Sequence, residues 1–169
     1  MSKAFTKDEG APAETVVVPR RAPLPAGTPN YVTATGLALL EEELAALERA
    51  RSAAVDVAER AVLDERVADL EARIASAELV DPASQPHDEV RFGATVTVEG
   101  DDGTHRYRIV GVDEADAARG RIAFVAPLAR ALLGKRVGDV PVVRTPAGES
   151  ELEVVAIDYD EHAIDRPPE

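Results

Sequence analysis

Two series of apolar residues at helical spacing constrain what this chain can fold into more than any other feature of its sequence. The first series is Leu37, Leu40, Leu44 and Leu47, and the second is Leu63, Val67, Leu70, Ile74 and Ala77. Steps of three and four residues place each series on one narrow face of a helix. Because a narrow apolar face is buried best against another of the same kind, the two series predict an antiparallel coiled-coil hairpin over residues 31–81.

The ends of this hairpin carry start and stop signals, whereas its turn carries none. Thr33 or Thr35 can cap the first helix, and Asp81-Pro82 ends the second. No Gly or Pro lies between Leu37 and Asp81, so symmetry alone places the turn near residues 52–58. The alternative is one long helix, which would leave both leucine faces exposed unless the protein dimerised. We therefore predict the hairpin.

Residues 1–30 differ from the rest of the chain in composition. This segment contains Pro12, Pro19, Pro23, Pro25 and Pro29. Because it has few residues that could form a core, we predict an extended, disordered arm. Its segment Val16–Arg21 could add a strand to a partner or dock on an acidic groove, and a solvated tail is the alternative.

After a linker at residues 82–88, the pattern changes to the two-residue period of β-strands. Strands are predicted at residues 90–98, 107–112, 122–125, 140–144 and 152–158, with a bend at Gly93 and turns at residues 100–103 and 145–148. Pro127 and Gly134 bound one short helix, since proline suits the first turn of a helix and glycine its end. This order predicts an α+β domain with a mostly antiparallel sheet over residues 82–159. A disordered tail is predicted at residues 160–169.

Composition and charge narrow the possible functions. The net charge is −13, and residues 32–81 and 82–169 each contribute −7. This excess opposes independent binding to nucleic acid, which needs clustered Lys and Arg, and favours a basic surface on the partner. The absence of cysteine excludes disulfides, thiolate zinc sites and cysteine nucleophiles. Because the sequence has neither a membrane span nor a signal-peptide pattern, we predict a cytoplasmic protein.

Catalytic motifs are also missing from the sequence. His87, His105 and His162 have no partner four residues away and no metal-ligand spacing, so we interpret them as surface histidines. There is no phosphate-binding glycine loop and no nucleophile elbow. We therefore predict a protein that is not an enzyme and holds no cofactor of its own.

Residues 89–158 resemble the C-terminal domain of the GreA/GreB transcription elongation factors. The matching blocks, in the order of the family, are Phe92-Gly93-Ala94, Tyr107–Gly111, Asp113-Glu114, Pro127 with Ala129-Arg130, Gly134-Lys135, Val137–Asp139 and Thr145–Glu149. Residues 31–81 are similar to the helical hairpin of that family, and residues 1–30 show a loose likeness to extensions of some GreB-like members. The resemblance implies an FKBP-like fold for the C-terminal domain and bacterial RNA polymerase as the partner.

The resemblance also implies a mechanism. The C-terminal domain would bind the rim of the polymerase, and the coiled coil would enter the secondary channel. In GreA and GreB the tip of the coil carries an Asp and a Glu three residues apart, in a G-D-x-x-E-N setting. These carboxylates help to bind a second Mg²⁺ and to activate the water that cleaves backtracked RNA, because Mg²⁺ prefers oxygen ligands and lowers the pKa of bound water.

Asp56 and Glu59 are the candidates for that acidic tip, where they would share Mg²⁺ with the polymerase. They have the same spacing and lie near the midpoint of the predicted hairpin. Two neighbours depart from the family pattern, since Val55 replaces the glycine and Arg60 replaces the asparagine. Arg60 could pair with a nearby carboxylate, and a solvated helix face is the alternative interpretation of the acidic pair.

The arms of the hairpin are shorter than the resemblance leads us to expect. Aligned on the leucines and on Val80-Asp81, each arm is about 11 residues shorter than in typical GreA, which at ~1.5 Å per residue is a deficit of roughly 16 Å at the tip. Unless the domain docks more deeply, Asp56 and Glu59 would stop short of the catalytic Mg²⁺. We therefore expect weak or no stimulation of transcript cleavage.

The candidate polymerase-binding loop is Val125, Ala126 and Pro127. GreB-like sequences tend to have Asp-Ser-Pro here, so only Pro127 is kept. The alternative is that Pro127 merely starts a helix.

Taken with the resemblance, these features predict a monomeric transcription elongation regulator that binds RNA polymerase. It would contact nucleic acid only within the polymerase complex and would not bind membranes. The alternative is a non-enzymatic FKBP-like interaction module that has another partner or a self-associating coil.

Overall fold

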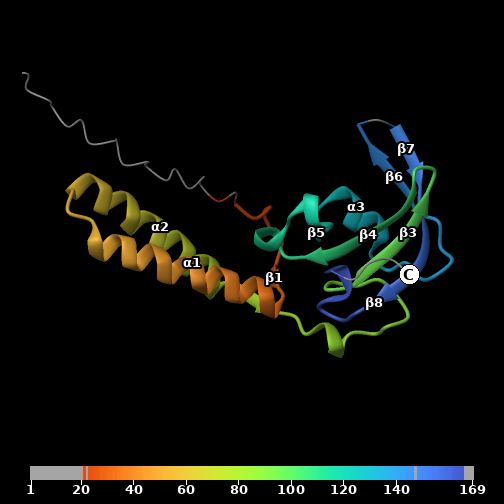
Figure 1. Ribbon diagram of the computed structural model, residues 1–169, viewed down its shortest axis with the longest axis horizontal. Coiled ribbons are helices and arrows are strands. Elements are labelled where there is room, and N and C mark those ends of the chain that lie inside the picture. The colour runs from red at the N-terminus through yellow and green to blue at the C-terminus, as the bar shows by residue number, and fades with distance from the viewer. Residues whose placement is uncertain (1–20, 22, 147, 166–169) are drawn as a thin grey trace, which may run out of the picture.

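The computed structural model describes residues 21, 23–146 and 148–165. Helix α1 (Ala34–Ala53) and helix α2 (Val57–Ala75) form an antiparallel hairpin that projects from one side of an α+β domain (Figure 1). The predicted combination of a coiled-coil hairpin and a β domain is therefore confirmed.

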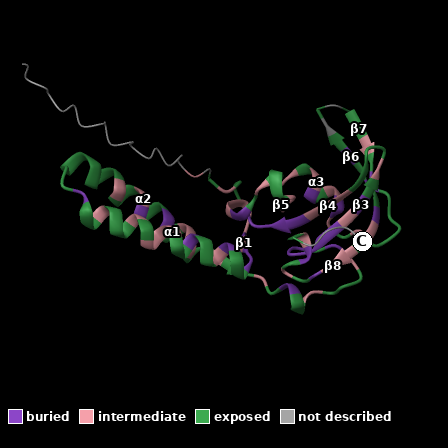
Figure 2. Cartoon of the chain, viewed as in Figure 1, coloured by how far each residue is buried: buried purple, intermediate pink, exposed green. Residues whose placement is uncertain are grey.

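The two leucine faces pack against each other within the hairpin. Leu40, Val67 and Leu70 are buried, whereas most of the outer surface of both helices is exposed (Figure 2). Of the two candidate caps, Thr33 is the one used, since its Oγ1 accepts a hydrogen bond of 2.9 Å from the amide of Gly36. The chain turns between Ala53 and Val57, so the predicted turn is confirmed and the single long helix is wrong.

A short parallel strand pair at the base of the hairpin was not predicted. Strand β1 (Asn30–Val32) pairs with strand β2 (Ala77–Leu79), and the whole hairpin is the connection between them. Helix α2 thus ends at Ala75, and Ala77 lies in a strand instead of the helix. Asn30, which we assigned to the disordered arm, is buried and donates hydrogen bonds to the carbonyl of Arg73 (2.8 Å) and to Ser76 Oγ (3.1 Å).

The main sheet has the strand order β5-β4-β3-β8. Its strands are β3 (Thr95–Gly100), β4 (Gly103–Val110), β5 (Arg121–Ala123) and β8 (Glu153–Asp158). Strands β3, β4 and β8 pair antiparallel, and β5 joins β4 in parallel. One face of this sheet forms the core with helix α3 (Pro127–Leu132), so the mostly antiparallel sheet with one short helix is confirmed.

Two strand predictions differ from the structure. Strand β6 (Val142–Thr145) pairs with strand β7 (Gly148–Glu151) in a separate hairpin, so β7 intervenes between the predicted turn and β8. Val90, Phe92 and Ala94 belong to the core but not to a strand, because Gly93, with φ of 86°, breaks the extended backbone before Thr95.

The segment that we predicted as a C-terminal tail covers the outer face of the sheet as far as residue 165. The 3-10 helix η4 (Ala163–Asp165) buries Ala163. Arg106 and Arg108 of β4 donate hydrogen bonds to the carbonyls of Ala163 and Glu161. Arg108 is only 2% exposed as a result, so this segment is held in place by buried guanidinium groups.

Candidate functional site

The tip of the hairpin presents the two carboxylates singled out in the sequence. Asp56 is the N-cap of α2, and its Oδ1 accepts hydrogen bonds from the amides of Ala58 (2.8 Å) and Glu59 (2.9 Å). A carboxylate is favourable there because the first amides of a helix have no partner within the helix. Asp56 and Glu59 are both exposed, so the pair lies at the outermost end of the coil.

Arg60 closes the turn instead of pairing with a carboxylate. Its Nη2 donates a 2.6 Å hydrogen bond to the carbonyl of Ala54, which is itself buried. A little further down the coil, Arg51 of α1 lies 3.6 Å from Asp64 of α2. Because the Arg51–Asp64 pair is exposed and contributes little stability, the hydrogen bond from Arg60 is the stronger of these two polar links near the turn.

Two valines flank Asp56 on the surface of the tip. Val55 is 92% exposed and Val57 is 84% exposed. The tip thus combines an acidic pair with two exposed apolar side chains. One of them, Val55, stands where the family pattern has a glycine.

The tip could supply only part of a metal site. One oxygen of Asp56 is engaged in capping, which leaves its second oxygen and the carboxylate of Glu59 as ligands. Within the described ranges, no group of three or more His, Asp or Glu side chains is arranged to hold a metal ion. Mg²⁺ needs near-octahedral oxygen coordination, so this tip fits an ion whose other ligands come from a partner.

The candidate docking loop lies on the α+β domain. Pro127 is exposed at the first turn of α3, and Val125 and Ala126 are half-buried before it. Behind the loop, Phe124 packs against Tyr31 and Phe92, with ring centroids 5.5 and 5.7 Å away. Pro127 therefore does start a helix. The loop directly follows Phe124, whose ring packs against two other aromatic rings.

The structure does not bring the acidic tip and the docking loop together. The tip is at the end of the hairpin away from the domain that carries α3 (Figure 1). Because α1 has 20 residues, the two regions are separated by about 30 Å of helix. A single partner would have to contact both regions at once through an extended surface.

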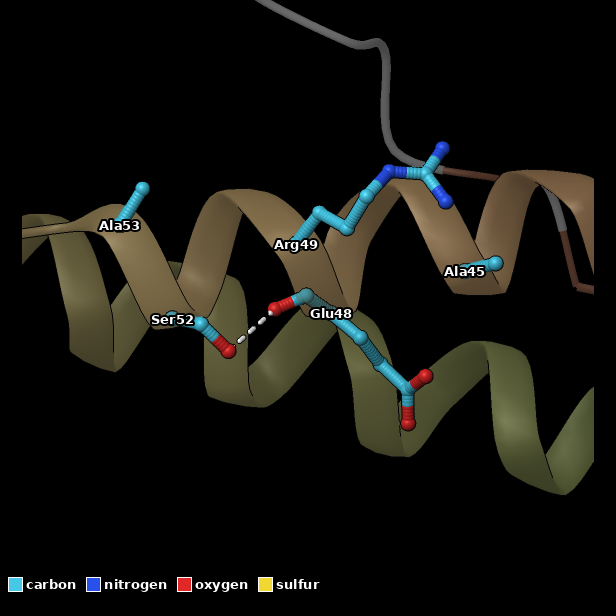
Figure 3. Close-up of a pocket in the computed structure, with 5 residues that line it drawn as sticks. All are labelled: Ala45, Glu48, Arg49, Ser52 and Ala53. Carbon is cyan, nitrogen blue, oxygen red and sulfur yellow. Dashed lines mark hydrogen bonds between the residues drawn. The ribbon is translucent and has the colours of Figure 1, made fainter.

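A pocket lined by residues of α1 is a weaker candidate (Figure 3). It is lined by Ala45, Glu48, Arg49, Ser52 and Ala53. Ser52 Oγ donates a 2.9 Å hydrogen bond to the carbonyl of Glu48. All five residues come from one helix, so polar groups do not converge there as they do in a ligand site.

An ionic cluster that no sequence pattern predicts lies at the junction between the hairpin and the domain. Arg21 contacts Glu43 of α1 and Asp113 of the 3-10 helix η2 (Val112–Glu114). Asp113 also lies 3.0 Å from Arg73 of α2. In the sequence, Asp113 stands out only as part of a block that matches the family, because no local pattern links residues so far apart in the chain.

The electrostatics of this junction favour charged Arg21. Burial by itself lowers the pKa of Arg21, but the hydrogen bonds and negative charges of Asp113 and Glu43 together raise it above its ordinary value. The guanidinium therefore stays protonated at the junction.

Comparisons with known proteins agree with these features. Residues 85–159 match the family described as "Transcription elongation factor, GreA/GreB, C-term". "Transcription elongation factor GreA" of Rickettsia conorii is 36% identical over 153 residues, covering 77% of this chain and 94% of the relative. GreA of Anaeromyxobacter is 44% identical over 106 residues, covering 60% of this chain but less than two thirds (63%) of the relative. A solved GreA/GreB structure from Nitrosomonas europaea is 26% identical, covers 76% of this chain and 98% of that one, and superposes with a TM-score of 0.40.

The alignment with the Rickettsia relative also shows that this chain lacks some of the relative's residues. It spans 153 residues but includes only 77% of the 169 residues of this chain, or about 130, so about 23 positions of the relative have no counterpart here. That number is close to the loss expected from two shortened arms.

Proposed function

We propose that this chain, which belongs to the GreA/GreB family of transcription elongation factors, binds bacterial RNA polymerase through its α+β domain and places its short hairpin in the secondary channel. The observation that carries the proposal is the combination of a domain matched to the family over residues 85–159 with a projecting hairpin that ends in Asp56 and Glu59. The excess of negative charge on the chain, −13, suits a basic channel surface.

The chain contributes no catalysis of its own in this proposal. The carboxylates of Asp56 and Glu59 would orient water or complete the coordination of a Mg²⁺ ion held by the polymerase only if the domain docked deeply enough to bring the short hairpin to the active centre, and the polymerase-held ion would supply the Lewis-acid chemistry. The protein would thus regulate elongation by occupying the channel, and it would act as a monomer.

Binding to purified core RNA polymerase tests the proposal directly. Labelled protein should bind the core enzyme and should be displaced by a full-length GreA. Failure to bind would favour the alternative of an interaction module with another partner, and concentration-dependent self-association in analytical ultracentrifugation would favour a self-associating coil.

The docking loop gives a sharper prediction. The double change Val125→Asp and Pro127→Ala should weaken polymerase binding at least several-fold, because it places a charge on a half-buried apolar contact and removes the rigid start of α3. The folded domain should survive, because Pro127 is exposed and Val125 is half-buried outside the core, where substitutions usually cost less stability than in the core.

Competition binding and the thermal midpoint measure the two effects separately. Val137→Asp is the matched control, because Val137 is 60% exposed on the same domain and lies outside the loop. Equal affinities for the parent and the loop variant would move the docking surface elsewhere.

A further inference from the structure

Besides the packing of Tyr31 against Phe92 and Phe124, two sets of contacts join the hairpin to the α+β domain, and the first lies at the base of α1. Thr33 Oγ1 donates a hydrogen bond to the carboxylate of Glu114, which is 6% exposed. Gly111 lies directly against the Tyr31 carbonyl, since a Cβ at this position would be 2.6 Å from that oxygen. These contacts hold one point close to the start of the helix, about which the hairpin could still tilt.

The second set of contacts is farther along α1 and depends on Arg21. Its Nη1 donates to Asp113 Oδ1 at 2.7 Å, and its Nη2 donates to the carboxylate of Glu43. Glu43 lies nine residues beyond the start of α1, which is about 14 Å along the helix axis. A tether at that distance resists tilting of the hairpin much more effectively than a contact at its base.

The junction is sufficiently buried for this tether to matter. The side chains of Asp113 and Arg73 are 7% and 10% exposed, and those of Arg21 and Glu43 are 29% and 38% exposed, so the cluster has a buried centre and a partly exposed edge toward Glu43. Solvent therefore weakens the Arg21–Glu43 pair more than the pairs of Asp113. Two guanidinium groups balance two carboxylates here. Without Arg21, only Arg73 would face the carboxylate of Asp113, and Glu43 would lose this link to the domain.

We propose that Arg21 is a positioning residue that sets the angle between the hairpin and the α+β domain, and thereby sets where the acidic tip lies. Arg21 precedes the hairpin and is outside the family match at residues 85–159. Over the ~30 Å length of α1, a tilt of about 10° moves the tip by about 5 Å, which is more than twice a Mg²⁺–oxygen distance. The consequence for the tip within the polymerase rests on the function proposed above, whereas the angle itself is a property of the free protein.

Distance measurements between two spin labels test this in the full chain. The protein has no cysteine, so Ala53→Cys and Asp101→Cys introduce unique labelling sites, both exposed, near the tip and on the β3–β4 turn. The parent should give one narrow distance distribution. Arg21→Gln should broaden it or shift its mean by about 5 Å or more, as estimated from the helix length. Arg21→Lys should fall in between, since one ammonium cannot bridge two carboxylates as a guanidinium does.

Three further variants make the test specific. Glu43→Gln should reproduce the effect of Arg21→Gln, and the double variant should add nothing further, because both changes remove the same link. Arg136→Gln is the control, since Arg136 pairs with Asp88 away from the junction and should leave the distribution unchanged.

The outcomes separate this inference from the proposed function. An unchanged distribution in Arg21→Gln would overturn the positioning role, whatever the polymerase does. A changed distribution supports it even if the parent protein fails to bind polymerase, which would refute only the proposed function.

Discussion

Purified protein should stimulate transcript cleavage in backtracked complexes weakly or not at all, while it still competes with a full-length GreA for the polymerase. The physical reason is the distance that the short hairpin leaves between its tip and the catalytic Mg²⁺. If each arm is about 11 residues short, as the resemblance leads us to expect, the tip would lie roughly 16 Å from the position of a full-length tip. A carboxylate ligates Mg²⁺ only at about 2.0–2.1 Å, so the retained spacing of Asp56 and Glu59 cannot compensate for such a deficit.

The structure allows a clean test of the acidic tip. Asp56→Asn keeps a side-chain oxygen that can cap α2 but removes the negative charge, so it changes metal binding without losing the cap. Asp69→Ala is the matched control, because Asp69 is an exposed carboxylate on α2 away from the tip. Cleavage products from stalled complexes are the readout. Robust Mg²⁺-dependent cleavage that disappears in Asp56→Asn and Glu59→Gln, but not in Asp69→Ala, would show that the short hairpin does reach the active centre.

The second large effect is expected in the seam of the hairpin. Leu70→Ala should destabilise the hairpin by about 3 kcal/mol, because truncation of a buried leucine costs roughly 2–5 kcal/mol. Leu70 is 3% exposed and belongs to a cluster with Leu40 and Val32. The α+β domain has its own core around Val96 and Ile109, so it should stay folded.

Amide hydrogen exchange measures both parts of the protein in one experiment. Protection in α1 and α2 should fall by about two orders of magnitude, since 1.4 kcal/mol corresponds to a factor of ten, while protection in β3 and β4 should not change. Leu39→Ala is the control, because Leu39 is 47% exposed on α1 and its truncation should have little effect. Equal losses for the two leucines would mean that the predicted seam does not stabilise the hairpin.

Local patterns in the sequence were sufficient to predict the two helices, a cap at Thr33 or Thr35 and the start of α3 at Pro127, because helical periodicity and capping depend on residues within a few positions of one another. The turn was placed by the symmetry of the two apolar series, and the choice of Thr33 over Thr35 came from the structure. Asp56 and Glu59 were placed at the tip because they lie near the midpoint of the predicted hairpin. Their charge pattern did not show that Asp56 would cap α2.

Contacts between distant segments could be seen only in three dimensions. Strands β1 and β2 have three residues each, too few to show a two-residue period, and they pair only because the hairpin returns the chain to its base. The packing of residues 160–165 over Arg108 likewise depends on a sheet face that no local pattern identifies as covered. The ionic link from Arg21 through Asp113 to Arg73 joins segments that are remote in sequence. The direction of the hairpin relative to the domain is therefore a property of the tertiary structure, since it depends on which charged groups the folded chain brings together.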